Sequence, residues 1–180
     1  MRWAAYFIFA YVALGLQLGL APEVAYHGAA PNLVLLAAIF ISLNAPRDAA
    51  LLGCFALGIV QDLLSSQPPG LFAMSYGLVA MFVISTQHVV YRGHPLTHFS
   101  LALVGGLMTM FILLLHGWIH PPGAARVEAK VALPAIRISP ATEFTRVLYT
   151  AVLAPFVLWG LQKTRGIFAF QSSRRKSKSW

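Results

Sequence analysis

Six long apolar stretches divide the chain, and short runs of polar or helix-breaking residues separate them. A bilayer core of about 30 Å needs roughly 20 apolar residues per helix, because unsatisfied backbone groups are not tolerated in hydrocarbon. Stretches near this length predict transmembrane helices over residues 3–21, 31–45, 49–65, 70–90, 96–119 and 145–162. The predicted fold is all-α, a polytopic bundle of six transmembrane helices over residues 1–162. An outer loop is expected at 116–144, and a basic cytoplasmic tail at 163–180.

The stretch at 31–45 is the shortest of the six. Its 15 residues reach only ~22 Å as a helix. It could be a span that thins the bilayer or a re-entrant segment. The charge pattern favours a full span, because Arg47 would otherwise lie on the wrong side of the membrane.

Lysine and arginine set the expected orientation, since positive residues near short loops are held on the cytoplasmic side. With six spans, nine basic residues share a side with the N-terminus: Arg2, Arg47, Arg92, Lys163, Arg165, Arg174, Arg175, Lys176 and Lys178. Four lie on the other side: Arg126, Lys130, Arg137 and Arg146. This bias predicts that both termini are cytoplasmic.

The composition supports this interpretation and excludes several others. The chain is 58% hydrophobic and only 10% charged, whereas soluble domains average roughly 25% charged residues. The net charge is +8, but six of the thirteen basic residues follow residue 162, so a basic nucleic-acid-binding face is not expected. A single cysteine, Cys54, excludes an intramolecular disulfide and is expected to be a small buried side chain.

The third stretch carries a carboxylate at membrane depth, Asp62, near its outer end. An ionisable group at that depth is functional by default. The alternative is an interfacial cap held by the hydroxyls of Ser65 or Ser66. A proton relay is disfavoured, because no second carboxylate lies within a span. The face that ends at Asp62 repeats every four residues and should point into the bundle: Ala50, Cys54, Gly58 and Asp62.

Other small residues predict close helix approaches. Gly15 and Gly19 form a GxxxG pair, for which packing inside the bundle is favoured over packing on another protein. Gly105 and Gly106, followed by Thr109, indicate a second close approach.

The histidines form two i, i+4 pairs, His94 with His98 and His116 with His120. About 27 Å of helix separates them, so they cannot share a metal ion, and interfacial histidines are expected instead. The chain lacks the G-x-S-x-G, H-E-x-x-H, P-loop and G-x-G-x-x-G patterns. We therefore expect no catalytic residue, no cofactor and no metal.

Two water-facing segments leave alternatives open. Residues 126–133 alternate apolar with other residues, which fits a short strand or docking segment, although an ordinary loop is favoured. The basic tail could bind anionic lipid or an acidic cytoplasmic partner, or could serve only to anchor the topology.

A family resemblance follows from the order of these elements. A Pro-polar apolar span at 31–36, a basic turn at 44–47, a glycine-bearing span ending in Asp-Leu at 58–65 and a Gly-led next span at 69–71 stand in one series. This series resembles MreD, the rod shape-determining membrane protein. The last span, with Pro155 and its basic exit, is also similar to the final helix of that family.

The resemblance implies an inner-membrane protein of the bacterial elongation machinery. Such a protein works directly with the membrane-anchored MreC, and through it with MreB filaments, the RodA glycosyltransferase and a penicillin-binding transpeptidase, in lateral peptidoglycan synthesis. The implied fold is similar to the six-helix substrate-binding subunits of vitamin ECF transporters. No catalytic residues carry over. Structural or partner-binding roles are expected for Pro31, Asn32, Arg47, Gly53, Gly58, Gln61, Asp62, Gly70 and Pro155.

The alternative function is a substrate-binding subunit of a vitamin-type transporter. Such a subunit needs several polar or aromatic groups converging from different spans. The polar residues inside the predicted spans are few, which favours a non-enzymatic scaffold that presents a face, or a pocket near Asp62, to MreC.

Overall fold

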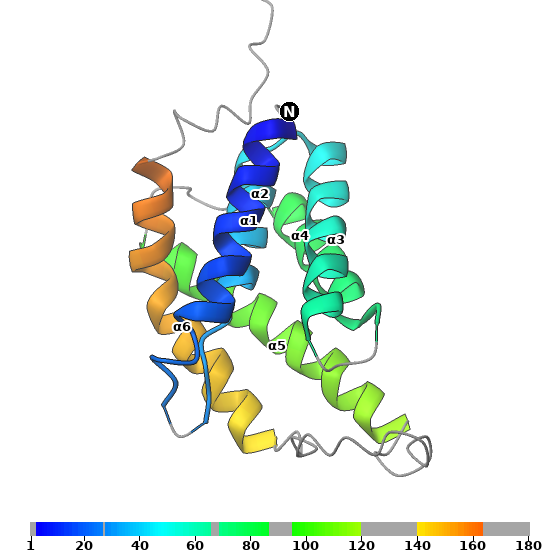
Figure 1. Ribbon diagram of the computed structural model, residues 1–180, viewed down its shortest axis with the longest axis vertical. Coiled ribbons are helices and arrows are strands. Elements are labelled where there is room, and N and C mark those ends of the chain that lie inside the picture. Colours follow the sequence, from blue (N-terminus) through cyan, green and yellow to red (C-terminus); the bar gives the residue numbers. More distant parts are fainter. Residues whose placement is uncertain (1–2, 27, 66–68, 87–94, 120–139, 164–180) are drawn as a thin grey trace, which may run out of the picture.

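The computed structural model describes residues 3–26, 28–65, 69–86, 95–119 and 140–163. These residues form an all-α bundle (Figure 1). Its helices are α1 (Trp3–Gly19), α2 (Leu33–Asn44), α3 (Arg47–Leu64), α4 (Leu71–Thr86), α5 (Pro95–Ile119) and α6 (Pro140–Lys163). Each predicted apolar stretch coincides with one helix, which confirms the all-α class.

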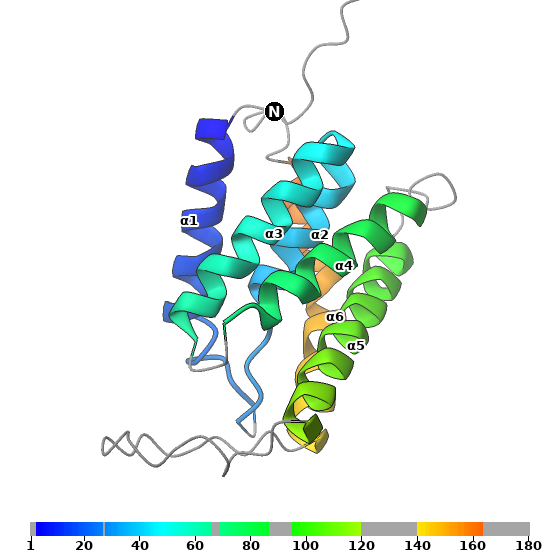
Figure 2. The same ribbon diagram turned by 90° about the vertical axis from the view of Figure 1, so that its right-hand side faces the viewer.

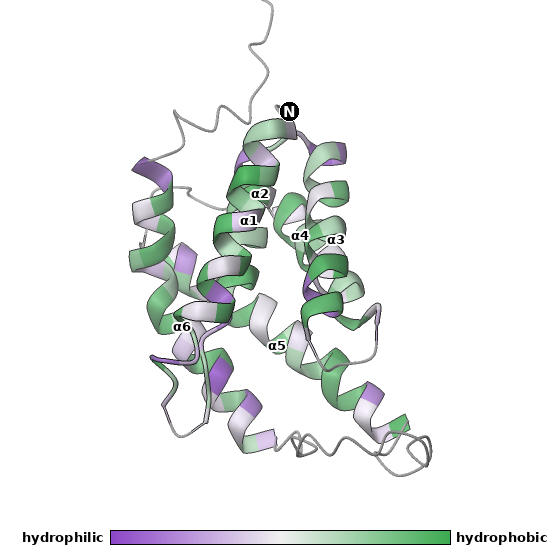
Figure 3. Cartoon of the chain, viewed as in Figure 1, coloured by the Kyte–Doolittle hydropathy of each residue, from purple (hydrophilic) through white to green (hydrophobic). Residues whose placement is uncertain are grey.

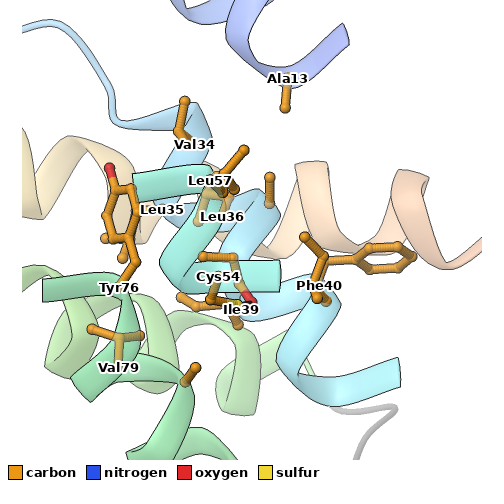
Figure 4. Close-up of a cluster of buried hydrophobic side chains, with 14 of the residues drawn as sticks. Ala13, Val34, Leu35, Leu36, Ile39, Phe40, Cys54, Leu57, Tyr76 and Val79 are labelled. Atoms are coloured by element: carbon orange, nitrogen blue, oxygen red, sulfur yellow. Dashed lines mark hydrogen bonds between the residues drawn. The ribbon is translucent and has the colours of Figure 1, made fainter. Parts of the chain in front are cut away.

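Helix α2 is the centre of the bundle. Every residue from Val34 to Asn44 is buried, and α2 contacts each of the other five helices. Figure 4 shows its side chains Leu36, Ile39 and Phe40 within the buried apolar cluster. The helix has 12 residues and is about 18 Å long. The other five helices pack around α2, so its backbone is buried along its length.

The helices run alternately between two ends of the bundle, as Figures 1 and 2 show. We call one the Pro31 end, where α1, α3 and α5 finish and α2, α4 and α6 begin. The other is the Arg47 end, where only Ala45 and Pro46 separate α2 from α3. Connections this short force neighbouring helices to pack antiparallel.

The starts of α2 and α3 differ in how they are capped. Asn32 is the N-cap of α2, so Pro31 lies one residue before the cap and not in the first helical turn. At α3 the N-cap position is Pro46, and Asp48 lies in the first turn instead of capping it. A carboxylate in a first turn still interacts favourably with the helix dipole.

Small residues decide how closely α3 and α4 approach. A Cβ atom built on Gly58 would lie 2.4 Å from the Cα atom of Ala73, a backbone atom of α4. The stripe that ends at Asp62 is buried, so the prediction that it faces the bundle is confirmed. Only hydrogen at position 58 permits this spacing of the two helices.

Of the other two glycine predictions, one is confirmed and one is wrong. Cβ atoms on Gly105 and Gly106 would lie 3.2 Å from Val79 and 2.9 Å from Val147, which confirms a close approach there. A Cβ atom built on Gly15 or on Gly19 would have no contact within 4 Å in the described part of the chain. Packing of the GxxxG pair inside the bundle is therefore wrong, because α1 turns this face outward.

Large apolar side chains cover much of the outer surface, and hydrophobic colouring extends over the helices in Figure 3. On α6 they recur at helical spacing and are half or more exposed at Phe144, Val152, Phe156 and Trp159. Two helical segments are long and apolar enough to cross a membrane, Leu96–Ile119 and Pro140–Lys163. The apolar helices α1, α2 and α4 are shorter.

Candidate functional site

Asn32 joins the start of α2 to three other helices. Its Oδ1 atom accepts the backbone N–H of Leu35 at 2.9 Å, as an N-cap does. Its own N–H donates to Thr150 Oγ1 on α6 at 2.9 Å. The hydroxyl of Tyr76 on α4 lies 3.1 Å from Asn32 Oδ1 and 2.7 Å from the side-chain amide of Gln61 on α3.

A second side chain caps α2 from α1. Gln17 Oε1 accepts the N–H of Leu33 at 2.7 Å and that of Val34 at 3.4 Å, and Gln17 Nε2 donates to the Pro31 carbonyl at 3.2 Å. The first turn of a helix leaves amides without intrahelical partners. Here the side chains of Asn32 and Gln17 accept hydrogen bonds from these amides, which fixes the start of α2 in place.

Asp62 performs the corresponding task for α4. Its Oδ1 atom accepts the N–H of Phe72 at 2.9 Å, and Oδ2 accepts those of Gly70 and Ala73 at 3.0 Å each. The residue is only 4% exposed. The carboxylate is thus a cap, but one held by backbone amides of the next helix. Ser65 Oγ donates to the Asp62 backbone carbonyl, and Ser66 lies outside the described residues.

Gly70 makes this cap possible. Its φ angle of 99° lies in the left-handed region, which glycine adopts without steric cost. The turn brings the N-terminus of α4 back onto the end of α3.

A pocket of about 160 Å³ lies beside these junctions at the Pro31 end. Its lining combines residues from α1, the segment before α2, and α2 to α6: Gln17, Ala30, Pro31, Asn32, Leu35, Gln61, Phe72, Gly106, Thr109, Met110, Leu113, Glu143, Arg146, Val147 and Thr150. Polar residues inside the predicted spans are few, yet at this end seven polar side chains line one pocket. The signal that could have revealed it is the set of amide and hydroxyl side chains scattered through the apolar stretches.

An ion pair stands in the wall of the pocket. Arg146 Nη1 lies 2.9 Å from Glu143 Oε1 and 3.1 Å from Oε2. The Glu143 side chain is 8% exposed and that of Arg146 is 31% exposed. Thr150 Oγ1 donates to the Arg146 carbonyl at 2.7 Å, which ties the pair to the Asn32 junction.

The predicted site residues separate into three groups. Pro31, Asn32 and Gln61 line the pocket. Gly58, Asp62 and Gly70 shape the adjoining α3–α4 hairpin. The other three lie elsewhere: Arg47 at the exposed start of α3, Gly53 beneath the Tyr6 ring, and Pro155 inside α6. The Tyr6 hydroxyl donates to the backbone carbonyl of Gly53 at 2.6 Å.

Sequence reasoning assigned no site role to Gln17, Tyr76, Glu143, Arg146 or Thr150. Tyr76 is fully buried on a largely apolar helix. Its hydroxyl therefore needs polar partners, which is the one signal that could have singled it out.

Only one histidine of each predicted pair, His98 and His116, lies within the described residues. His98 is 2% exposed, and its Nε2 atom lies 2.8 Å from Gln162 Nε2 at the Arg47 end. His94 and His120 lie outside the described residues, as do segment 126–133 and the tail from residue 164. In the part of the chain that the structure describes, no three histidine, cysteine or acidic side chains are grouped to hold a metal ion.

Comparison with known families supplies the identification. The model of the family described as rod shape-determining protein MreD matches residues 1–160. Neither the curated proteins nor the solved structures gave a match. The family match spans all six helices, including the hairpin and the pocket. The chain therefore belongs to the MreD family of rod shape-determining membrane proteins.

Proposed function

We propose that this chain is a non-enzymatic scaffold that binds an MreC-like protein through the pocket at the Pro31 end. By holding MreC, it would help direct lateral peptidoglycan synthesis and rod shape, with MreB filaments, RodA and a penicillin-binding transpeptidase as indirect partners. The observation that carries the proposal is the pocket, where seven polar side chains converge in a bundle whose outer surface is strongly apolar.

The apolar surface fits lipid as the surrounding solvent. Soluble monomers rarely expose large contiguous apolar patches. Here Phe111 on α5 is 66% exposed, and Phe156 on α6 is 72% exposed. We place all six helices in the bacterial cytoplasmic membrane with both termini cytoplasmic, so that the Pro31 end faces outward. The likeness to ECF substrate-binding subunits stays a prediction.

The pocket suits a protein segment better than a vitamin-like molecule. Small-molecule sites usually have volumes of roughly 300–1,000 Å³. This pocket measures about 160 Å³, and several of its polar groups already bond to one another and to backbone amides. A recess of this size, lined by both polar and apolar groups, can receive one or a few residues of a partner.

The test is co-purification with the MreC-like protein of the same bacterium in mild detergent. Ala30 lines the pocket and is half-buried, so Ala30→Phe should fill the recess. Ala141 is exposed at the same end and does not line the pocket, so Ala141→Phe is the matched control. We expect Ala30→Phe to abolish capture of the partner while Ala141→Phe retains it.

Equal capture by both variants, or no capture by the native chain, would contradict the proposal. Recovery of energising ATPases in place of the MreC-like protein would support the transporter alternative. Size-exclusion profiles of both variants establish that they are folded.

A further inference from the structure

The pocket carries a balanced pair of charges. Glu143 and Arg146 are the only ionisable side chains among the described residues that line it. They stand three residues apart on α6, and one guanidinium nitrogen, Arg146 Nη1, lies within 3.1 Å of both carboxylate oxygens of Glu143. The wall therefore presents no net charge to an occupant.

Because Glu143 is buried, the neutral charge of the pair restricts which groups can enter the pocket. The Glu143 residue is 6% exposed, and it lies in the first turn of α6, where the helix dipole also favours its negative charge. A further charge brought into the pocket would have to leave water without an opposite charge to pair with, which is unfavourable. A charged side chain of a partner is thereby disfavoured.

Neutral hydrogen-bonding groups are available instead. Asn32 Oδ1 is engaged by Leu35 and Tyr76, whereas no bond among the described residues engages Asn32 Nδ2. One end of the Gln61 amide meets Tyr76, and no bond within the described part of the chain engages its other end. Both side chains line the pocket. Two primary amides with a free edge match a peptide backbone or a neutral polar side chain.

We infer that the pocket accepts an uncharged, hydrogen-bonding segment of its protein partner, and that the neutral Glu143–Arg146 pair sets this preference. The inference rests on the proposed function, because it concerns the occupant of the same pocket. It adds the chemistry of that occupant and two residues that determine it.

The test compares variants that unbalance the pair with variants that keep it neutral. Glu143→Gln and Arg146→Gln each leave one charge uncompensated, whereas the double variant Glu143→Gln/Arg146→Gln and the swap Glu143→Arg/Arg146→Glu are neutral. Capture of the MreC-like protein is measured in detergent for the full chain. Glu23, exposed at the same end and outside the lining, gives the control Glu23→Gln.

We expect each single variant to lower capture at least about tenfold, because truncating one partner of this part-buried pair leaves the other charge unpaired in the wall. We expect the neutral doubles to stay within about threefold of the native chain. If the single variants fail to fold, the two neutral doubles decide alone, and loss of capture in both overturns the inference.

Three other patterns also overturn it. Unchanged capture in every variant means that the pair does not select the occupant. If capture survives Glu143→Gln but is lost in Arg146→Gln and in the neutral Gln/Gln double variant, the occupant is an anionic segment. If capture survives Arg146→Gln but is lost in Glu143→Gln and in the same double variant, the occupant is a cationic segment. All three differ from failure of the proposed function, in which the native chain captures nothing or Ala30→Phe has no effect.

Discussion

The carboxylate of Asp62, in the last turn of α3, accepts the backbone N–H of Phe72, in the first turn of α4, at 2.9 Å. At the end of its own helix this negative charge is disfavoured by the helix dipole, whereas at the start of α4 the dipole favours it. A single side chain therefore stabilises the junction of two helices, and its charge requires no metal ion or proton relay.

Replacing Asp62 should destabilise the bundle. Asp62→Ala leaves three amides without their acceptor, and we expect a loss of about 2–4 kcal/mol in the free energy of unfolding. The apparent melting temperature in detergent reports the loss. Asp48→Ala is the control, because Asp48 is exposed in the first turn of α3. Equal melting temperatures for the two variants would contradict a capping role for Asp62.

Gly58→Ala should disrupt the α3–α4 packing. The added methyl group would lie 2.4 Å from the Ala73 Cα atom and 2.6 Å from the Phe72 carbonyl oxygen, both backbone atoms that cannot turn aside. We expect little monodisperse protein by fluorescence-detected size-exclusion chromatography. Gly15→Ala, where a Cβ meets nothing within 4 Å, should give the native profile. A normal profile for Gly58→Ala would show that the helices do not approach as closely as described.

Thr150→Val removes the acceptor for the Asn32 N–H while keeping the side-chain shape. A buried amide left unpaired costs about 1–3 kcal/mol, so thermal stability should fall. Thr145→Val serves as the comparison, since Thr145 Oγ1 donates only within its own helix, to the Ala141 carbonyl. Should both variants melt alike, the bond between α2 and α6 contributes nothing measurable.

The proposed orientation can be tested with single cysteines. In a Cys54→Ala background, Glu23→Cys at the Pro31 end should react with a membrane-impermeant maleimide when only the outer membrane is permeabilised. Asp48→Cys, exposed at the Arg47 end, should react only after the inner membrane is opened. Labelling of both positions from the same side would exclude an odd number of crossings between them.

Much of the fold was predictable, because each apolar stretch of the sequence coincides with one helix. The boundaries of α2 and α3 followed from the residues between them, Ala45 and Pro46, and the buried face of α3 followed from its spacing of small residues. What the sequence could not predict is which polar group meets which. The partners of Asp62 are backbone amides, and because every residue except proline has one, the pattern of side chains does not identify them.

The pocket was even harder to predict from the sequence than the partners of Asp62. Its polar residues come from several elements, and Asn32 and Thr150 stand 118 residues apart in the sequence. The Glu143–Arg146 pair was placed in a loop and at its edge, because residues 140–144 are too polar to predict a span. Convergence depends on helix packing, which hydrophobic periodicity does not specify.

The enclosure of α2 also bears on how the protein is made. Four of the five helices that surround it follow it in the chain, so its protein environment exists only after translation is complete. Until then the nascent chain holds a helix about 12 Å shorter than the hydrocarbon layer. Integration into the membrane must therefore be a property of the whole polypeptide, and a truncation that ends after α2 should fail to insert as a stable hairpin.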